Sequence, residues 1–235
     1  MLPKLNDNPK YNEIIPSLGK KIRFRPYLVK EEKILLLAAE TGDSTDILNA
    51  IADTVSACIE DEIDLDNLTS FDVEYLFLKI RSKSVGETQN LNIKCKECDH
   101  GNDFTIDFRK IEIDVPDVQE KIQLTDTVAL KMKWPSYRKI LNDAQLQAAK
   151  NKTEFAFRYI ALCIDSIMTE NENISTKDVT QEDLDEFINS MSGQQYNSLE
   201  SYFKSMPKLK YDIDFECTNC QHHNKYQLNE VNDFF

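Results

Sequence analysis

The stretch FECTNCQHHNKYQL, residues 215–228, is the part of the sequence from which the fold is predicted most directly. It places Cys217 and Cys220 in a short turn between two runs in which apolar and polar residues alternate. Such alternation is typical of half-buried β-strands, and two strands around a tight turn form a hairpin. The stretch therefore predicts a β-hairpin that presents a Cys-x-x-Cys motif at its tip.

A second hairpin of the same design occurs earlier in the chain, in LNIKCKECDHGNDF, residues 91–104. Its cysteines, Cys95 and Cys98, precede Cys217 and Cys220 by a constant offset of 122 positions (95 to 217 and 98 to 220). The same offset aligns five further pairs: His100 with His222, Asn102 with Asn224, Leu91 with Ile213, Ile93 with Phe215 and Phe104 with Tyr226. The chain therefore contains an internal repeat of one hairpin.

The two cysteine pairs together predict one metal site. Structural zinc takes four tetrahedral ligands, and paired Cys-x-x-Cys motifs in a protein without a secretory signal indicate metal more often than disulfides. We predict that Cys95, Cys98, Cys217 and Cys220 bind one Zn²⁺ and join the hairpins into a zinc-ribbon-like unit. Four thiolates leave no coordination position for water or substrate, so the predicted site is structural.

Two other classes of protein contain paired cysteines. A redox protein would leave the pairs without metal, although a thioredoxin-like pair lies between a strand and a helix, and neither pair here does. A nucleic-acid-binding zinc ribbon needs basic hairpins, whereas these carry acidic residues such as Glu97, Asp103 and Asp214. The net charge of −13 also disfavours binding to phosphates. Both classes remain as rivals of the main prediction.

The residues around the cysteine hairpins predict an α+β protein with a mostly helical body and short antiparallel hairpins. We divide the chain into five segments: 1–29, extended with a small hairpin; 30–86, helical; 87–133, the first cysteine hairpin and further strands; 134–206, helical; and 207–235, the second cysteine hairpin and the C-terminal tail. No Gly/Ser-rich or Pro-rich linker separates the segments, so we expect one compact unit.

Apolar periodicity places the individual elements. Helices are predicted over 29–42, 44–59 and 70–83 in the first helical segment, and over 136–150, 154–168, after Thr180 and over 194–205 in the second. Before the second set, KIQL (121–124) and VALKMKW (128–134) are expected to pair as two strands.

The residue types available disfavour an enzyme. All three histidines, His100, His222 and His223, lie in the two cysteine turns, so none is left elsewhere to act as a general base or to complete a catalytic triad. The five glycines are scattered and form no phosphate-binding loop. The longest apolar run, residues 34–39, is far too short to span a membrane. We expect a non-enzymatic cytoplasmic protein without a small-molecule substrate.

The stretch PSLGKKIRFRPYLVKEEKILLLAAE, residues 16–40, resembles the opening of the baseplate proteins of T4-like contractile-tailed phages. In that family a Pro-Ser-x-Gly turn, an Arg-Pro-aromatic step and a Glu-Glu-Lys helix precede a helical segment and Cys-x-x-Cys turns, and members close on an aromatic end like DFF. The resemblance implies a structural or assembly protein of the central baseplate hub. It also implies a place in the virion tail baseplate after assembly in the host cytoplasm, with other hub and tail proteins as partners. A hub subunit and a hub assembly chaperone absent from the mature virion both remain open.

Two groups of residues are candidates for contact with those partners. The first is the basic-aromatic step formed by Arg23, Arg25, Tyr27 and Leu28, and the second is the aromatic pair Phe234 and Phe235. The alternative for the first group is that Tyr27 and Leu28 belong to the core and that the arginines pair with acids of the same chain.

Overall fold

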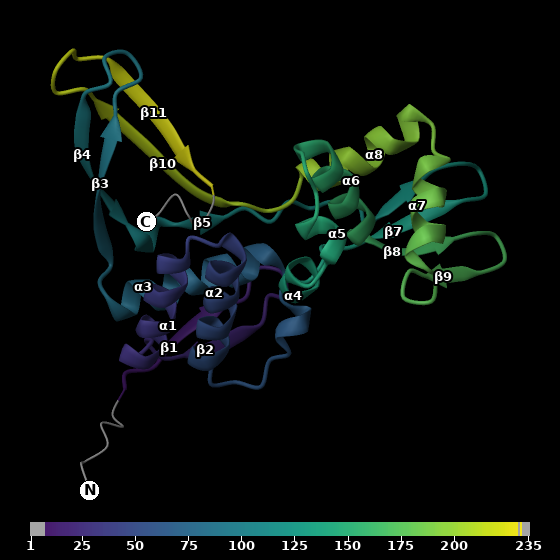
Figure 1. Cartoon of the computed structure of the whole chain (residues 1–235), viewed down its shortest axis with the longest axis horizontal. Helices are drawn as coiled ribbons and strands as arrows, with labels where there is room; N and C mark the ends of the chain where they lie inside the picture. Colours follow the sequence, from purple (N-terminus) through teal and green to yellow (C-terminus); the bar gives the residue numbers. More distant parts are fainter. Residues whose placement is uncertain (1–7, 230, 232–235) are drawn as a thin grey trace, which may run out of the picture. The chain divides into compact units, whose positions relative to one another are not determined.

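The computed structural model describes residues 8–229 and residue 231, which are divided between two units (Figure 1). Unit 1 contains the described residues of 1–115 and 207–235, whereas unit 2 consists of Pro116–Met206. Unit 2 is therefore inserted into the sequence of unit 1, and a proline is the first residue after each junction. The predicted segment 87–133 spans the first junction, and the five-segment division stays a prediction.

Unit 1 begins with the small hairpin and the three helices that the sequence predicts. Strand β1 (Tyr11–Ile14) pairs antiparallel with β2 (Lys21–Phe24), and α1 (Val29–Thr41), α2 (Ser44–Cys58), the 3-10 turn Leu65–Asn67 and α3 (Ser70–Ser84) follow. Helix α1 ends where Gly42 adopts a φ of 68°, a left-handed conformation that glycine reaches without steric cost. Apolar side chains of β2, α2 and α3 form the core of this part: Ile22, Phe24, Ile51, Val55, Phe71, Leu76, Phe77 and Ile80.

A buried carboxylate attaches the N-terminal turn to α3. Asp72 is fully buried, and at the start of α3 it forms a capping box with Thr69, in which its N–H donates to the Thr69 hydroxyl and its carboxylate accepts from the Thr69 N–H. The carboxylate accepts from the Thr69 backbone N–H at 2.9 Å and from the hydroxyl at 2.7 Å. It also accepts from the Ser17 N–H at 2.9 Å and hydroxyl at 2.5 Å. A single carboxylate thus satisfies four donors from two segments, so it fixes the turn between β1 and β2 on the helix terminus.

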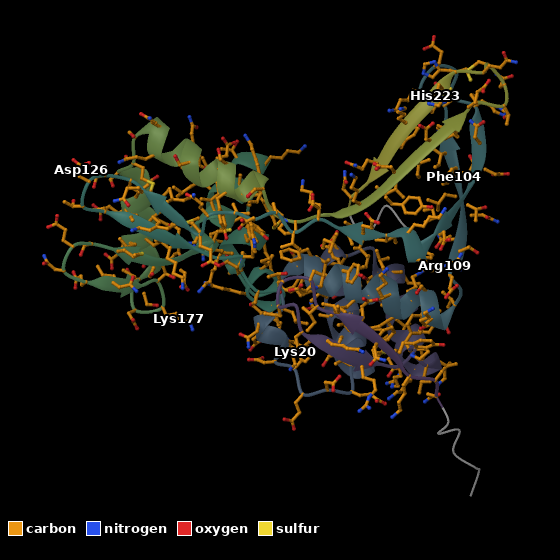
Figure 2. All side chains as sticks on the ribbon, turned by 180° about the vertical axis from the view of Figure 1, so that it is seen from behind. Lys20, Phe104, Arg109, Asp126, Lys177 and His223 are labelled. Carbon is orange, nitrogen blue, oxygen red and sulfur yellow. The ribbon has the colours of Figure 1, made fainter. Side chains whose placement is uncertain are left out.

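Two further hairpins of unit 1 carry the cysteine motifs. Strand β3 (Thr88–Lys94) pairs with β4 (Gly101–Asp107), and β10 (Leu209–Glu216) pairs with β11 (His223–Leu228), both antiparallel. Strand β10 also pairs with the short β5 (Glu112–Ile113), which follows the 3-10 turn Phe108–Lys110. The turns of the two hairpins lie together (Figure 2), and the ring of Phe104 on β4 lies 6.4 Å from that of Phe215 on β10. The sequence repeat is therefore a structural repeat.

Unit 2 is built on a four-stranded antiparallel sheet with the order β6-β7-β8-β9. Its strands are β6 (Lys121–Gln123), β7 (Ala129–Met132), β8 (Ile164–Met168) and β9 (Asn173–Ser175), and its helices are α4 (Tyr137–Leu141), α5 (Ala144–Gln147), α6 (Lys152–Leu162), α7 (Gln181–Asn189) and α8 (Gly193–Lys204). Its core combines strand and helix residues, among them Leu130, Ile160, Ile164, Leu199 and Tyr202. The pairing of β6 with β7 confirms the strands predicted from KIQL and VALKMKW.

Two of the predicted helices are wrong in extent. The helix predicted over 154–168 ends at Leu162, because residues 164–168 form β8, a strand paired on both sides and buried at most positions. A short apolar run of this kind fits a buried strand as well as a helix. The helix predicted over 136–150 is two short helices with separate N-caps, Ser136 and Asp143.

The expectation of a mostly helical body is also wrong. Helices account for 41% of the structure and strands for 25%, so the α+β class holds but helices do not dominate it. Part of the difference lies in the sheet of unit 2, because one of its two central strands, β8, occupies residues for which a helix is predicted. Among the described helices, none has both the length and the apolar character that crossing a bilayer requires.

We expect unit 1 to fold without unit 2. Ile113 of β5 and Leu209 of β10 are directly paired, so the two ends of unit 1 that lead to unit 2 lie next to each other. Replacing residues 116–206 with about eight Gly and Ser residues should therefore cost little loop entropy. Amide NMR spectra of the shortened and the full chain should agree for α1–α3, whereas a loss of dispersed signals would show that unit 1 depends on unit 2.

Candidate metal centre

The four paired cysteines come together in unit 1. Their Sγ atoms all lie within 4.8 Å of one another, and they form the site between the tips of the two hairpins. The Sγ atoms of Cys95 and Cys220 are 3.7 Å apart, as are those of Cys98 and Cys217. A tetrahedral zinc ion with Zn–S bonds of about 2.3 Å requires sulfurs roughly 3.8 Å apart. The donor type, number and spacing therefore fit zinc.

The two Cys-x-x-Cys turns have the same backbone conformation. In the first, the N–H of Asp99 donates to the carbonyl of Cys95 at 3.0 Å; in the second, the N–H of Gln221 donates to that of Cys217 at 2.9 Å. Asp99 and Gln221, which are aligned by the 122-residue offset, both adopt left-handed φ angles, 55° and 61°. The repeat thus extends to the turn that directs both sulfurs of a pair toward one point.

Asn224 connects its own turn to the cysteine of the other hairpin. It is fully buried, and its side-chain N–H donates to the carbonyl of His222 at 2.9 Å and lies 3.5 Å from the Sγ of Cys95. Its side-chain oxygen accepts from the backbone N–H of Lys96 at 3.0 Å. One amide therefore holds the second hairpin against the first turn and directs a donor at a thiolate.

Asn102 makes the equivalent contacts from the first hairpin to the turn of the second. Its side-chain N–H donates to the carbonyl of His100 at 2.9 Å and lies 3.7 Å from the Sγ of Cys217, and its oxygen accepts from the N–H of Thr218 at 2.9 Å. The roles of Asn102 and Asn224 were missed in the sequence analysis, although their alignment in the repeat was visible. Donors of this kind orient metal ligands and stabilise their charge.

Substitution of Asn224 by alanine is expected to weaken zinc binding by about 10–100-fold, because the thiolate of Cys95 loses a donor and the first turn loses an anchor. Competition against a chromophoric chelator measures this affinity. Asn92→Ala on the exposed face of β3 is a matched control and should leave it unchanged. Equal affinities for all three proteins would contradict the role assigned to the amide.

The electrostatics of the site favour thiolates. The backbone N–H of Cys220 lowers the pKa of Cys217 to about 6. At Cys95 burial disfavours the charged form, but hydrogen bonds from surrounding N–H groups outweigh it and lower the pKa. A hydrogen bond from the N–H of His222 favours the thiolate of Cys220, yet the neighbouring sulfur of Cys98 raises its pKa to about 12. The neighbouring sulfurs therefore oppose the simultaneous ionisation of all four thiols. A bound cation would stabilise the thiolate form of all four.

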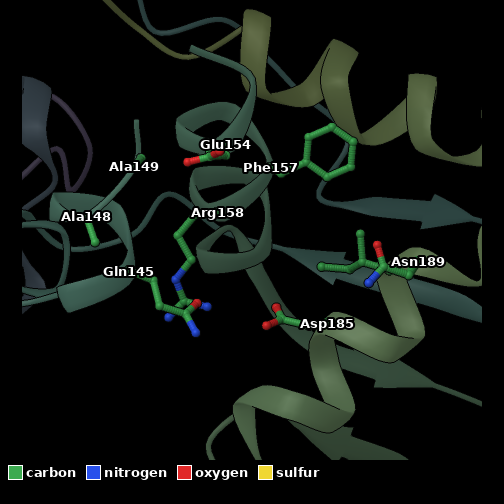
Figure 3. A pocket seen from close by; sticks show the side chains of 9 residues that line it. Gln145, Ala148, Ala149, Glu154, Phe157, Arg158, Asp185 and Asn189 are labelled. Atoms are coloured by element: carbon green, nitrogen blue, oxygen red, sulfur yellow. The ribbon is translucent and has the colours of Figure 1, made fainter. Parts of the chain in front are cut away.

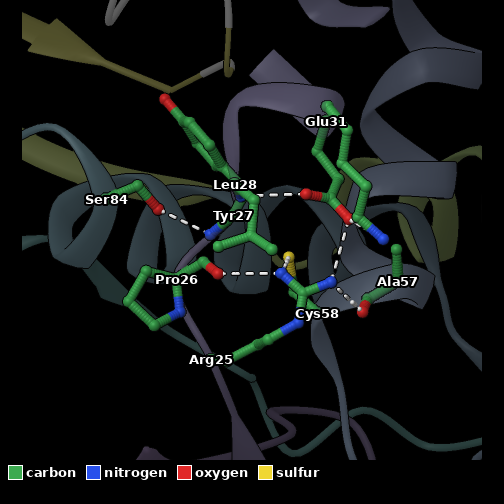
Figure 4. A network of polar contacts seen from close by, with 9 residues as sticks. Arg25, Pro26, Tyr27, Leu28, Glu31, Ala57, Cys58 and Ser84 are labelled. Carbon is green, nitrogen blue, oxygen red and sulfur yellow. Dashed lines mark hydrogen bonds and ion pairs between the residues drawn. The ribbon is translucent and has the colours of Figure 1, made fainter. Parts of the chain in front are cut away.

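Arg25, one of the predicted partner contacts, makes several contacts within unit 1 (Figure 4). Its guanidinium pairs with Glu31 at 2.9 Å and donates to the carbonyls of Ala57 and Pro26, both at 2.9 Å. Glu31 in turn accepts from the N–H of Leu28 at 2.8 Å and caps α1. Burial disfavours the charged carboxylate, but the hydrogen bonds from Arg25 and Leu28 lower the pKa of Glu31. The Arg-Pro step is therefore part of the start of α1.

The other predicted contact residues are placed differently. The side chain of Arg23 is 54% exposed and pairs with Glu60 at 3.0 Å. Tyr27 and Leu28 are partly buried. Phe234 and Phe235 lie outside the described residues. Both arginines thus pair with acids of the same chain, as in the alternative given above, and the partner contact of these residues stays a prediction.

Among the cavities that described residues form away from the cysteines are the following two. One, in unit 2, has a volume of about 430 Å³, and its lining includes Arg158, Asp185 and Asn189 (Figure 3). Arg158 forms an ion pair with Asp143, in which the Nε–H of Arg158 donates to the Oδ1 of Asp143 at 2.8 Å. The other, in unit 1, has a volume of about 440 Å³ and is mainly apolar. Neither contains a nucleophile paired with a base.

The comparisons with known proteins agree with the resemblance of residues 16–40. The sequence profile of a family described as T4 bacteriophage base plate protein matches residues 8–235, which include both units and both cysteine hairpins. No curated protein and no solved structure matches the chain. A family match over nearly the whole length shows membership. The chain therefore belongs to the T4 bacteriophage base plate protein family.

Proposed function

We propose that this protein is a non-enzymatic structural or assembly component of the central hub of the baseplate, cross-linked internally by one zinc ion. The observation that carries the proposal is that a base plate family matches residues 8–235, while the same chain gathers four thiols at distances suited to zinc. Its partners are other hub and tail proteins, and it is oligomeric only within their assembly. Its place is the virion tail baseplate, assembled in the host cytoplasm.

The proposed zinc ion joins two hairpins that are distant in sequence. Cys95 and Cys98 belong to the turn between β3 and β4, and Cys217 and Cys220 to the turn between β10 and β11. Alternate side chains of β3 and β10 are exposed, so each of these strands has only one face available for packing. A metal cross-link would add to the stability that this packing supplies.

The chemistry of the site supports a role without catalysis. Four thiolates complete the coordination of zinc, so neither water nor a substrate has a position on the ion. The histidines are at the cysteine turns, and His223 pairs with Asp214 at 2.8 Å. Exposed acidic residues on the hairpins, including Glu97, Asp103 and Asp212, disfavour the rival proposal of a nucleic-acid-binding zinc ribbon.

Quantitative mass spectrometry of gradient-purified particles and of tail intermediates from an infection tests the proposal. A fixed copy number in mature particles supports a hub subunit, and presence in intermediates alone supports the assembly chaperone. Absence from both would overturn the proposed function. A thiol titration that is unaffected by a chelator would instead favour the redox rival over zinc.

A further inference from the structure

An apolar groove lies on unit 1 among α1, α2 and α3. Its lining includes aliphatic and aromatic side chains from each helix: Leu35 and Leu36, Ile47 and Ile51, and Phe77. Tyr27 and Val85 also border it. The volume of about 440 Å³ is sufficient for several side chains. Grooves of this composition between helices are suited to receive the apolar face of another helix.

Helix α1, which forms one wall of the groove, is apolar but little buried. Among its residues only Glu31 and Ala38 are buried, whereas Leu36 is 61% exposed. Ile34 and Leu37 of the same helix are also about half exposed, and so is Val85 on the opposite wall. Exposed apolar side chains that border a groove, as Leu36 and Val85 do here, are typical of an interaction site.

The charged residues of the lining are not equivalent. The guanidinium of Arg81 donates to Gln89 at 2.6 Å and lies 4.8 Å from the ring of Phe108, and these two residues are outside the lining. No described residue makes a hydrogen bond or ion pair with the carboxylate of Glu32, which is half-buried on the α1 wall. Of the two charges in the lining, Glu32 is therefore the one left for a ligand to pair with.

We propose that this groove docks an apolar helix that carries a basic residue and belongs to another protein of the tail assembly. Leucine-like side chains of that helix would enter between Leu36 and Phe77, and its Lys or Arg would pair with Glu32. The net charge of −13 attracts a basic partner and opposes a second copy of this chain. The inference rests on the proposed function for the source of the partner.

Two synthetic helical peptides are the probes for the test, used with the full chain and measured by fluorescence anisotropy. Both have leucines at i, i+3, i+4 and i+7; one has lysines and the other glutamates on the remaining face. The lysine peptide is expected to bind at least about tenfold more tightly than the glutamate peptide. Glu32→Lys should reverse this preference.

Two matched variants separate groove binding from general attraction to an acidic protein. Leu36→Glu lies in the groove, and Leu18→Glu changes a leucine that is 50% exposed in the β1–β2 turn outside it. Both add one negative charge, so non-specific binding of the lysine peptide would strengthen equally. Docking in the groove instead predicts a loss of about tenfold or more for Leu36→Glu and none for Leu18→Glu. Equal binding by the two variants would overturn the inference.

Sedimentation velocity tests whether a second copy of this chain occupies the groove instead. A dimer of the wild-type chain that Leu36→Glu dissociates would assign the groove to a second copy and overturn the proposal. The peptide-binding and sedimentation results do not depend on the proposed function, because the proposed function is tested by the copy number of the protein in particles. If the protein is present in tails but its groove binds neither peptide, only this inference is contradicted. If the groove binds the lysine peptide but the protein is absent from tails, only the proposed function is contradicted.

Discussion

Substitution of Cys217 by serine is expected to abolish stoichiometric zinc binding and to lower the free energy of unfolding of unit 1 by roughly 5 kcal/mol. A cross-link that closes a loop of about 100 residues contributes about 4.7 kcal/mol in the chain-entropy model. Zinc bound to Cys98 and Cys217 closes a loop of that order, residues 98–217. Binding free energy of structural zinc adds directly to folding because the unfolded chain has no preformed site.

Metal analysis and urea unfolding measure these two effects. Chelation of the wild-type protein should reproduce the loss of stability, and zinc, but not magnesium, should restore it. Hydrogen exchange should accelerate first in β3, β4, β10 and β11, since these strands depend on the cross-link. Cys58→Ala is the control: Cys58 is buried in α2, away from the four-cysteine cluster, so this variant should keep one zinc per chain. Full zinc content in Cys217→Ser would refute the assigned ligand.

Substitution of Asp72 by alanine is expected to lower the free energy of unfolding of unit 1 by about 3–5 kcal/mol, because several hydrogen bonds to a charged acceptor are lost and each contributes about 1.5–3 kcal/mol. The carboxylate is fully buried and accepts from the backbone and hydroxyl groups of both Ser17 and Thr69. Its removal leaves buried donors unpaired and releases the N-terminal turn from α3.

Urea unfolding of Asp72→Ala, Asp72→Asn and Asp53→Ala tests this expectation. The asparagine variant keeps the shape and one acceptor oxygen but presents an N–H₂ group in place of the other oxygen, so it should lose stability, although less than the alanine variant. Asp53 is exposed in α2, and its replacement should change the free energy of unfolding by less than about 0.5 kcal/mol. Similar stabilities for Asp72→Ala and Asp53→Ala would contradict the role of the buried carboxylate.

The cysteine centre was the most predictable part of this protein. The two-residue spacing within each pair, and the offset of 122 between pairs, are properties of the sequence alone, and a repeated hairpin implies a repeated turn. The two hairpins and the meeting of the four sulfurs agree with this prediction. Short-range patterns succeed here because the turn geometry is decided by the few residues inside it.

The least predictable part was the sheet of unit 2. Strand β8, Ile164–Met168, directly follows α6, and Ile167 fits a helical period as well as a strand. Its pairing with β7 and β9 decides the conformation, and the residues of β7 lie more than thirty positions earlier in the chain. Local propensity is a weak guide where such distant pairing partners are available.

By itself the sequence determined the α+β class, the repeated cysteine hairpin, the hairpin and three helices at the start of unit 1, and the resemblance to a base plate family. Only the tertiary structure decided that two units exist, that Asn102 and Asn224 cross over between the turns, and that the apolar α1 forms the wall of an open groove. The physical reason is the range of the interactions. Turns, caps and periodicity depend on neighbours along the chain, whereas burial and hydrogen bonding depend on segments that meet only when the chain is folded.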